Sequence, residues 1–155
     1  HKLIYKIKDN VELNDIPKES SMLGKANLIK EGSDITIVAY SNMVNVAKEA
    51  IAADELQNCS IELIDLQTVS PIDYDTIKNS LKKTKRLLVC QEAPSNSSVG
   101  TTVISKIVES ELFHKLEVAP KLVSGLHSPM PSAKHLELNV IPQAEDITNA
   151  VKSMI

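Results

Sequence analysis

The chain has 155 residues, of which 43% are hydrophobic, and a formal net charge of −3. This length and apolar content are sufficient for one domain with a buried core, and they exclude a disordered segment. The absence of a basic block argues against nucleic-acid binding, and no apolar run approaches the ~20 residues that span a bilayer. Cys59 and Cys90 lack metal or redox spacing, which favours reduced core thiols.

The first 23 residues are polar apart from a short apolar opening, and they include Pro17. We interpret residues 1–23 as a linker or arm, and residues 24–155 as a single domain. The opening at His1 is typical of the middle of a protein, so we expect this chain to be a fragment from which an N-terminal domain is missing.

Apolar runs and helical periodicity then alternate along the chain. Residues 28–29 precede a turn over residues 30–34. A continuous β-branched and apolar run predicts a strand buried on both faces at 35–39, and further strands are predicted at 61–66, 87–90 and 121–126. Amphipathic patterns predict helices over 43–56, 73–83, 99–112, 133–138 and 144–154. This alternation predicts an α/β fold, a three-layer α/β/α sandwich with a mostly parallel sheet.

Ligands of such sheets usually bind beyond the carboxyl ends of the strands, but no phosphate-binding glycine motif occurs there. The polar stretch 95–100 precedes a helix, and helix capping explains it better than an anion site does. We interpret Asp73 as a helix N-cap, and Asp65 and Glu92 as acceptors for loop N–H groups. The basic run 82–86 lies where a helix is expected to end, and cations are favourable there.

Three histidines are candidate bases or metal ligands: His114, His127 and His135. His114 lies at a predicted helix end, which favours a packing or dipole role, and His127 follows a strand beside a proline-rich loop. His127 and His135 have no carboxylate or cysteine at metal-ligand spacing. The chain also lacks a Ser/His/Asp or Cys/His arrangement, so we predict no catalytic, cofactor-binding or metal-binding residue in it.

Many short motifs occur in the order seen in one enzyme family. The chain resembles the C-terminal, transketolase-like domain of the β subunit of thiamine-diphosphate-dependent 2-oxoacid dehydrogenase E1 components. Among these it resembles pyruvate dehydrogenase E1β most, followed by the branched-chain 2-oxoacid dehydrogenase E1β. The residues that carry the resemblance are 1–5, 24–26, 31–38, 64–66, 71–73, 76–77, Ser80, 83–84, Arg86, 92–93, 119–120 and 136–137.

Three loops depart from the family pattern. Gln67 stands where the family usually has Arg, residues 97–102 replace a glycine-rich GGxGAE stretch, and Ser132 replaces an aromatic residue. We expect these loops to contact neighbouring domains. The partner-interface residues that we predict are Gln67, Ser97, Ser98, His127, Ser132, Lys152 and Ile155.

The resemblance implies a division of labour within a larger enzyme. Thiamine diphosphate and Mg²⁺ would be held by the α subunit and the missing N-terminal domain of the β subunit, and none would be bound by this domain. The domain itself would assemble an α2β2 tetramer and dock the E2 acyltransferase, with Lys152 and Ile155 in the E2-facing patch. The isolated chain would be inactive.

The resemblance leaves several alternatives open. They are a branched-chain E1β, the C-terminal domain of transketolase or deoxyxylulose-phosphate synthase, a non-enzymatic interaction module, and a flavodoxin-like nucleotide binder. A mitochondrial matrix, a plastid and a bacterial cytoplasm are all compatible with it. We also expect the isolated domain to associate weakly with itself, since such a domain normally buries apolar surface against partners.

Overall fold

A five-stranded mixed sheet forms the middle layer of the molecule. The computed structural model describes residues 4–8 and 23–155, so most of the predicted linker, namely residues 1–3 and 9–22, lies outside the described residues. The strands are β1 (Asn27–Lys30), β2 (Ile35–Ala39), β3 (Ile61–Asp65), β4 (Leu87–Pro94) and β5 (Lys121–Gly125), in the order β1-β3-β2-β4-β5. β1 pairs antiparallel with β3, and the other neighbouring strands pair parallel.

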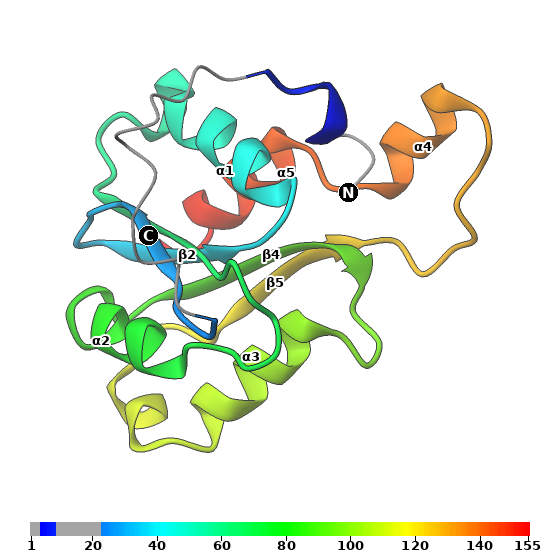
Figure 1. The fold of residues 1–155 in the computed structure, drawn as a ribbon. Helices are drawn as coiled ribbons and strands as arrows, with labels where there is room; N and C mark the ends of the chain where they lie inside the picture. The colour runs from blue at the N-terminus through cyan, green and yellow to red at the C-terminus, as the bar shows by residue number, and fades with distance from the viewer. Residues whose placement is uncertain (1–3, 9–22) are drawn as a thin grey trace.

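Helices cover both faces of this sheet (Figure 1). α1 (Met43–Ala52) and α5 (Ala144–Lys152) lie on one face, whereas α2 (Tyr74–Thr84) and α3 (Val99–Val108) lie on the other. Short 3₁₀ turns, η1 (Ile4–Lys6), η2 (Asp54–Leu56) and η3 (Glu111–Lys115), and a projecting helix, α4 (Lys134–Val140), complete the described elements. The predicted three-layer sandwich with a mostly parallel sheet is confirmed.

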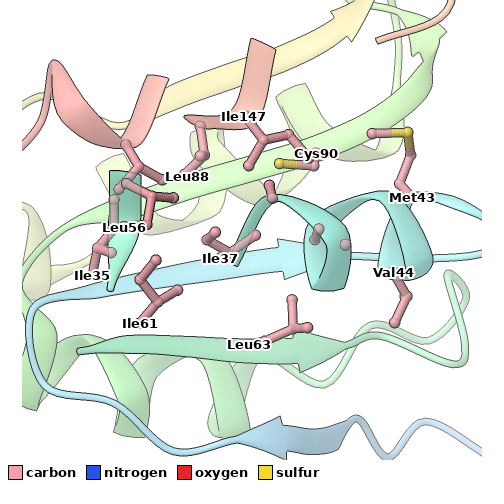
Figure 2. Close-up of a cluster of buried hydrophobic side chains, with 14 of the residues drawn as sticks. Ile35, Ile37, Met43, Val44, Leu56, Ile61, Leu63, Leu88, Cys90 and Ile147 are labelled. Atoms are coloured by element: carbon pink, nitrogen blue, oxygen red, sulfur yellow. The ribbon is translucent and has the colours of Figure 1, made fainter. Parts of the chain in front are cut away.

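The core lies on both faces of β2, in which every residue is fully buried. Ile35, Ile37 and Ala39 point toward α1 and α5, because alternate side chains of a strand point to the same face (Figure 2). Val38 points to the opposite face, where it joins Ile77 of α2 and residues of α3. Burial on both faces explains why the sequence of such a parallel strand is a continuous run of β-branched and apolar residues.

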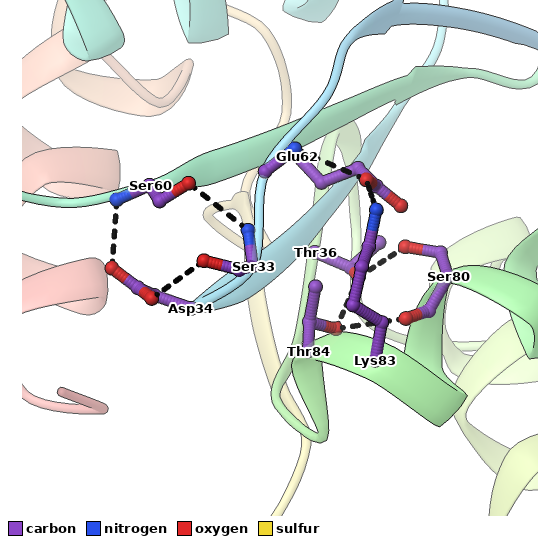
Figure 3. Close-up of polar contacts among 9 residues, drawn as sticks. Ser33, Asp34, Thr36, Ser60, Glu62, Ser80, Lys83 and Thr84 are labelled. Carbon is purple, nitrogen blue, oxygen red and sulfur yellow. Dashed lines mark hydrogen bonds and ion pairs between the residues drawn. The ribbon is translucent and has the colours of Figure 1, made fainter.

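Buried polar groups at the amino ends of β2 and β3 have partners (Figure 3). The hydroxyl of Thr36 on β2 is fully buried and forms a hydrogen bond of 2.6 Å with the hydroxyl of Thr84. Glu62 on β3 accepts a hydrogen bond of 3.1 Å from Gly32 N–H and forms an ion pair with Lys83. Burial alone would raise the pKa of Glu62, but the hydrogen bonds and the charge of Lys83 outweigh it and lower that pKa.

Several element boundaries differ from the predicted ones. Residues 27–30 form an additional strand, β1, and β4 continues through residues 91–94 because it pairs with β5 beyond a register shift. The two longest predicted helices are shorter: α1 and α3 end before η2 and η3, which occupy the final turns of the predicted spans. Asp73 caps α2 as predicted, accepting a hydrogen bond of 3.1 Å from Thr76 N–H.

Candidate functional site

The loops beyond the carboxyl ends of the parallel strands hold an unusual number of left-handed residues. Ser41 follows β2 with a φ of 57°, Gln67 follows β3 with 51°, and Ser97 lies between β4 and α3 with 48°. Such backbone is uncommon for residues other than glycine, and strained conformations gather where a structure must present a particular surface. We call this part of the molecule the carboxyl edge.

Two carboxylates near these loops accept hydrogen bonds from backbone N–H groups of the domain. The carboxylate of Asp65 accepts a hydrogen bond of 3.0 Å from Gln67 N–H, which fixes the turn after β3. Asp73 is almost fully buried and accepts hydrogen bonds from the N–H groups of Ala26 and Thr76, both at 3.1 Å. Burial would raise the pKa of Asp73, but these hydrogen bonds outweigh it and lower the pKa. The predicted structural roles of Asp65 and Asp73 therefore match the geometry.

A buried glutamine holds the loop between β4 and α3. The side chain of Gln91 is fully buried; its Oε1 accepts a hydrogen bond of 2.7 Å from Gly100 N–H. Its Nε2 donates to the carbonyl oxygens of Ala93, at 2.9 Å, and Pro94, at 3.0 Å. A Cβ at position 100 would lie 2.6 Å from Gln91 Oε1, so the glycine permits this close approach.

The first turn of α3 is likewise closed by its own residues. Ser98 is buried, its hydroxyl accepts a hydrogen bond of 3.3 Å from Thr101 N–H, and the Thr101 hydroxyl accepts one of 3.1 Å from Ser98 N–H. This is a capping box. Because Gln91 and Ser98 occupy the N–H groups of Gly100 and Thr101, the stretch 95–100 is a helix cap and offers these groups to no anion.

Polar side chains from β4 and from the loop after β2 meet near the centre of the carboxyl edge. Asn42, which precedes α1, donates from Nδ2 to Glu92 Oε1 at 3.4 Å, so the Glu92 carboxylate accepts a hydrogen bond from a side chain of this loop. Burial, and then the negative charge of Glu92, raise the pKa of the Tyr40 phenol. The Tyr40 phenol therefore stays protonated at neutral pH and is not a base.

The three described histidines lie on different elements of the fold. His127 is exposed in the segment after β5, His135 is exposed on α4, and His114 packs edge-to-face against Phe113 at a centroid distance of 5.6 Å. Among residues 4–8 and 23–155, no three His, Cys, Asp or Glu side chains lie together in a way that would hold a metal ion. Both cysteines are free, and burial raises the pKa of Cys90 far above its usual range, so that thiol is inert.

The segment from β5 through α4 exposes an apolar surface, which we call the arm (residues 126–140). In Figure 1, α4 projects to one side of the sandwich, and it makes no extensive contact with any other described element. The large apolar side chains of the arm are between 46% and 59% exposed: Leu126, Met130, Leu136 and Leu138. Hollows of about 300 Å³ and about 100 Å³ lie where the arm meets the body. Such a surface is typical of a protein contact.

The predicted interface residues fall on two opposite ends of the sheet. Gln67, Ser97 and Ser98 lie in loops of the carboxyl edge, and His127 and Ser132 lie in the arm. Lys152 and Ile155 lie at the end of α5, which runs back to the amino end of β5, where Lys121 Nζ donates to Ser153 Oγ at 2.7 Å. All of them are exposed except Ser98, whose hydroxyl is already used by the cap.

Sequence reasoning missed the four apolar residues of the arm. Leu136 and Leu138 are two positions apart in a short helix between prolines, and this spacing places them on different sides rather than on one apolar stripe. A helix with leucines on several sides exposes apolar surface unless another element or a partner covers it. This pattern is the signal that could have identified the arm.

Comparison with known proteins now defines the class of the chain. Residues 24–147 match the family described as the transketolase C-terminal domain. The chain belongs to this family. Its fold is also that of the inactive β4 tetramer of a split-gene transketolase, with a TM-score of 0.72, 24% identity, and coverage of 89% of this chain and 44% of that one.

Several similar sequences are named as pyruvate dehydrogenase E1 β subunits. The pyruvate dehydrogenase E1 component subunit beta of Rickettsia bellii is 40% identical over 97% of this chain and 44% of its own length. The mitochondrial pyruvate dehydrogenase E1 β subunit of Pisum sativum is 38% identical over 84% of this chain and 36% of its own. That of Dictyostelium discoideum is 36% identical over 97% of this chain and 42% of its own. The chain thus spans less than half the length of these relatives. None of the described helices has the length and apolar character needed to cross a membrane.

Proposed function

We propose that the chain is the C-terminal domain of a pyruvate dehydrogenase E1 β subunit, and that its role there is subunit assembly and E2 docking. The observation that carries the proposal is the identity of 40% to such a subunit along 97% of this chain. The series of family motifs that occur in the same order along the chain supports the same proposal. The whole enzyme would decarboxylate pyruvate oxidatively and pass the acyl group to the lipoyl group of E2.

Thiamine diphosphate and Mg²⁺ would supply the carbanion chemistry of that enzyme. The described residues of this chain do not fit such a group. Gln91 and Ser98 occupy the N–H groups of α3 that would otherwise bind a phosphate, and the carboxylates of Asp65 and Asp73 are engaged by backbone N–H groups. We therefore assign cofactor binding to the rest of the protein and its α subunit, and derive no catalytic step in this chain.

Two contact surfaces support the assembly role. The arm and the exposed loop residues Gln67 and Ser97 offer apolar and polar contacts at one end of the sheet, which we assign to the α subunit and the second β subunit of an α2β2 tetramer. Lys152 and Ile155 lie at the opposite end, where Lys152 forms an ion pair with Glu55, and we assign this end to E2. Because the two surfaces are separated by the length of the sheet, one domain can engage both partners together.

The relatives also bear on location. Those from Pisum sativum and Dictyostelium discoideum carry the word mitochondrial in their names, and those of Rickettsia are bacterial. We infer that the protein acts in a mitochondrial matrix, a plastid or a bacterial cytoplasm, where the same complex would operate.

Native mass spectrometry of the full-length β subunit co-expressed with its α subunit tests the assembly role. We expect an α2β2 species, and we expect the double substitution Leu136→Ser and Leu138→Ser to shift it toward separate subunits, because it replaces the exposed leucines of the arm with polar groups. A matched control, Val108→Ser with Phe113→Ser, changes two apolar residues of α3 and η3 that are also partly exposed, each 41%. Equal assembly of both double variants would contradict the assignment of the arm.

A further inference from the structure

A wide groove lies on the outer side of the α2/α3 face, between α2 and η3. Its volume is about 560 Å³, which is within the range of small-ligand sites. Lys78 and Lys82 line it from α2, Lys115 lines it from η3, and Leu112 contributes an apolar side chain. Lys78 and Lys82 are one helical turn apart, so their side chains lie on the same side of α2.

The lysines of this groove differ from their neighbours in the basic run 82–86. Lys83 pairs with the buried Glu62, and Lys85 and Arg86 both pair with Glu117. Each of these neighbours thus has a carboxylate partner within the domain. Lys82 instead donates to the neutral Asn79 Oδ1 at 2.9 Å.

Among the residues that the structure describes, Lys78, Lys82 and Lys115 form no ion pair. Two carboxylates, Asp75 and Glu111, also line the groove, yet neither lies within ion-pair distance of a groove lysine. Three ammonium groups against two carboxylates leave the groove positive. Like charges one turn apart on α2 repel each other, and the two carboxylates offset this repulsion only in part, so an anion from outside would lower it further.

We propose that this groove binds a compact polyanion that carries two or more phosphate groups. A ligand with several negative charges can contact lysines from both walls at once, whereas a single charge gains little over the repulsion of Asp75 and Glu111. The proposal goes beyond the assembly role above and does not depend on it, because the groove lies on α2 and η3 rather than on the arm or at the end of α5.

Titration of the chain with inorganic pyrophosphate, followed by amide chemical shifts in NMR, tests the proposal. We expect saturable shifts confined to residues 75–82 and 110–115. We expect the double variant Lys78→Gln with Lys82→Gln to weaken binding about tenfold, since each exposed ion pair accounts for a factor of roughly two to five. The control is Lys30→Gln with Lys48→Gln, which removes the same charge from exposed lysines on β1 and α1 and should leave affinity within about twofold.

Three outcomes would overturn the proposal. They are equal weakening in the two double variants, shifts spread over all lysine-bearing surfaces, and the same shifts with potassium chloride at matched ionic strength, which would show screening alone. Thermal unfolding of both double variants shows whether the fold is intact, and unchanged midpoints are expected because the substituted lysines make no ion pair.

Discussion

The substitution Gln91→Leu removes the side chain that holds the loop between β4 and α3. Leucine has a similar volume but accepts and donates nothing, so three hydrogen bonds, from Gly100 N–H and to the carbonyl oxygens of Ala93 and Pro94, are lost. The two carbonyl groups belong to residues that are partly accessible to water, whereas Gly100 is buried. An unsatisfied buried N–H costs about 1–3 kcal/mol, so we expect the free energy of unfolding to fall by about 3 kcal/mol.

Urea unfolding followed by circular dichroism measures this loss. With an m value of about 2 kcal/mol/M for a domain of this size, the midpoint should fall by about 1.5 M. The same change at the exposed Gln57, whose Nε2 donates to Asp54 at 2.7 Å, should alter stability by less than about 0.5 kcal/mol. A Gln91→Leu midpoint equal to that of the Gln57→Leu control would refute the reasoning, because the buried hydrogen bonds would then contribute nothing.

Three further predictions follow from other contacts. Because the pKa of Glu62 is lower in the folded protein than its ordinary value of 4.5, its ionisation stabilises the fold above that pH, and this contribution is lost as the pH falls through the lowered pKa. Glu62→Gln should therefore destabilise the chain at pH 7 and flatten the acid limb of its stability profile, as denaturant midpoints at several pH values would show. Gly125→Ala would place a Cβ 2.2 Å from the carbonyl oxygen of Glu92, so we expect a loss of about 2–4 kcal/mol in urea unfolding; an unchanged midpoint would mean that β4 and β5 separate easily. Lys152→Glu in the full-length subunit should weaken E2 binding in surface plasmon resonance by about tenfold, whereas Lys48→Glu on α1 should not, and equal effects would remove Lys152 from the E2 surface.

The buried part of the fold was predictable because its sequence signals are strong. Ile35 to Ala39 is apolar except for Thr36, which is itself β-branched, and the strand lies in the centre of the sheet, where both faces are covered. β1 was not predicted because it is an edge strand in which three of four residues are exposed, so no apolar run marks it. β4 extends to Pro94 only because Gly125 of β5 pairs with it, and the local sequence at 91–94 gives no sign of that distant partner.

The candidate surfaces were less predictable than the core. Gln67 and Ser97 could be chosen because they depart from a family pattern, but the pattern does not show their left-handed backbone, which at Gln67 accompanies a hydrogen bond from its N–H to Asp65. The exposure of the arm follows from where α4 packs, and a short helical pattern does not say which of its leucines a partner covers. The groove lysines resembled their paired neighbours in sequence, and only the positions of Glu62 and Glu117 distinguish them.

Decarboxylation by the assembled enzyme tests the central claim most directly. The full-length β subunit co-expressed with its α subunit would be supplied with thiamine diphosphate and Mg²⁺, and given pyruvate, 3-methyl-2-oxobutanoate or a sugar phosphate, with the present chain alone as the control. The account predicts turnover of pyruvate by the assembly and none by the chain alone. Turnover of a sugar phosphate with neither 2-oxoacid consumed would contradict it, and so would decarboxylation by the chain alone.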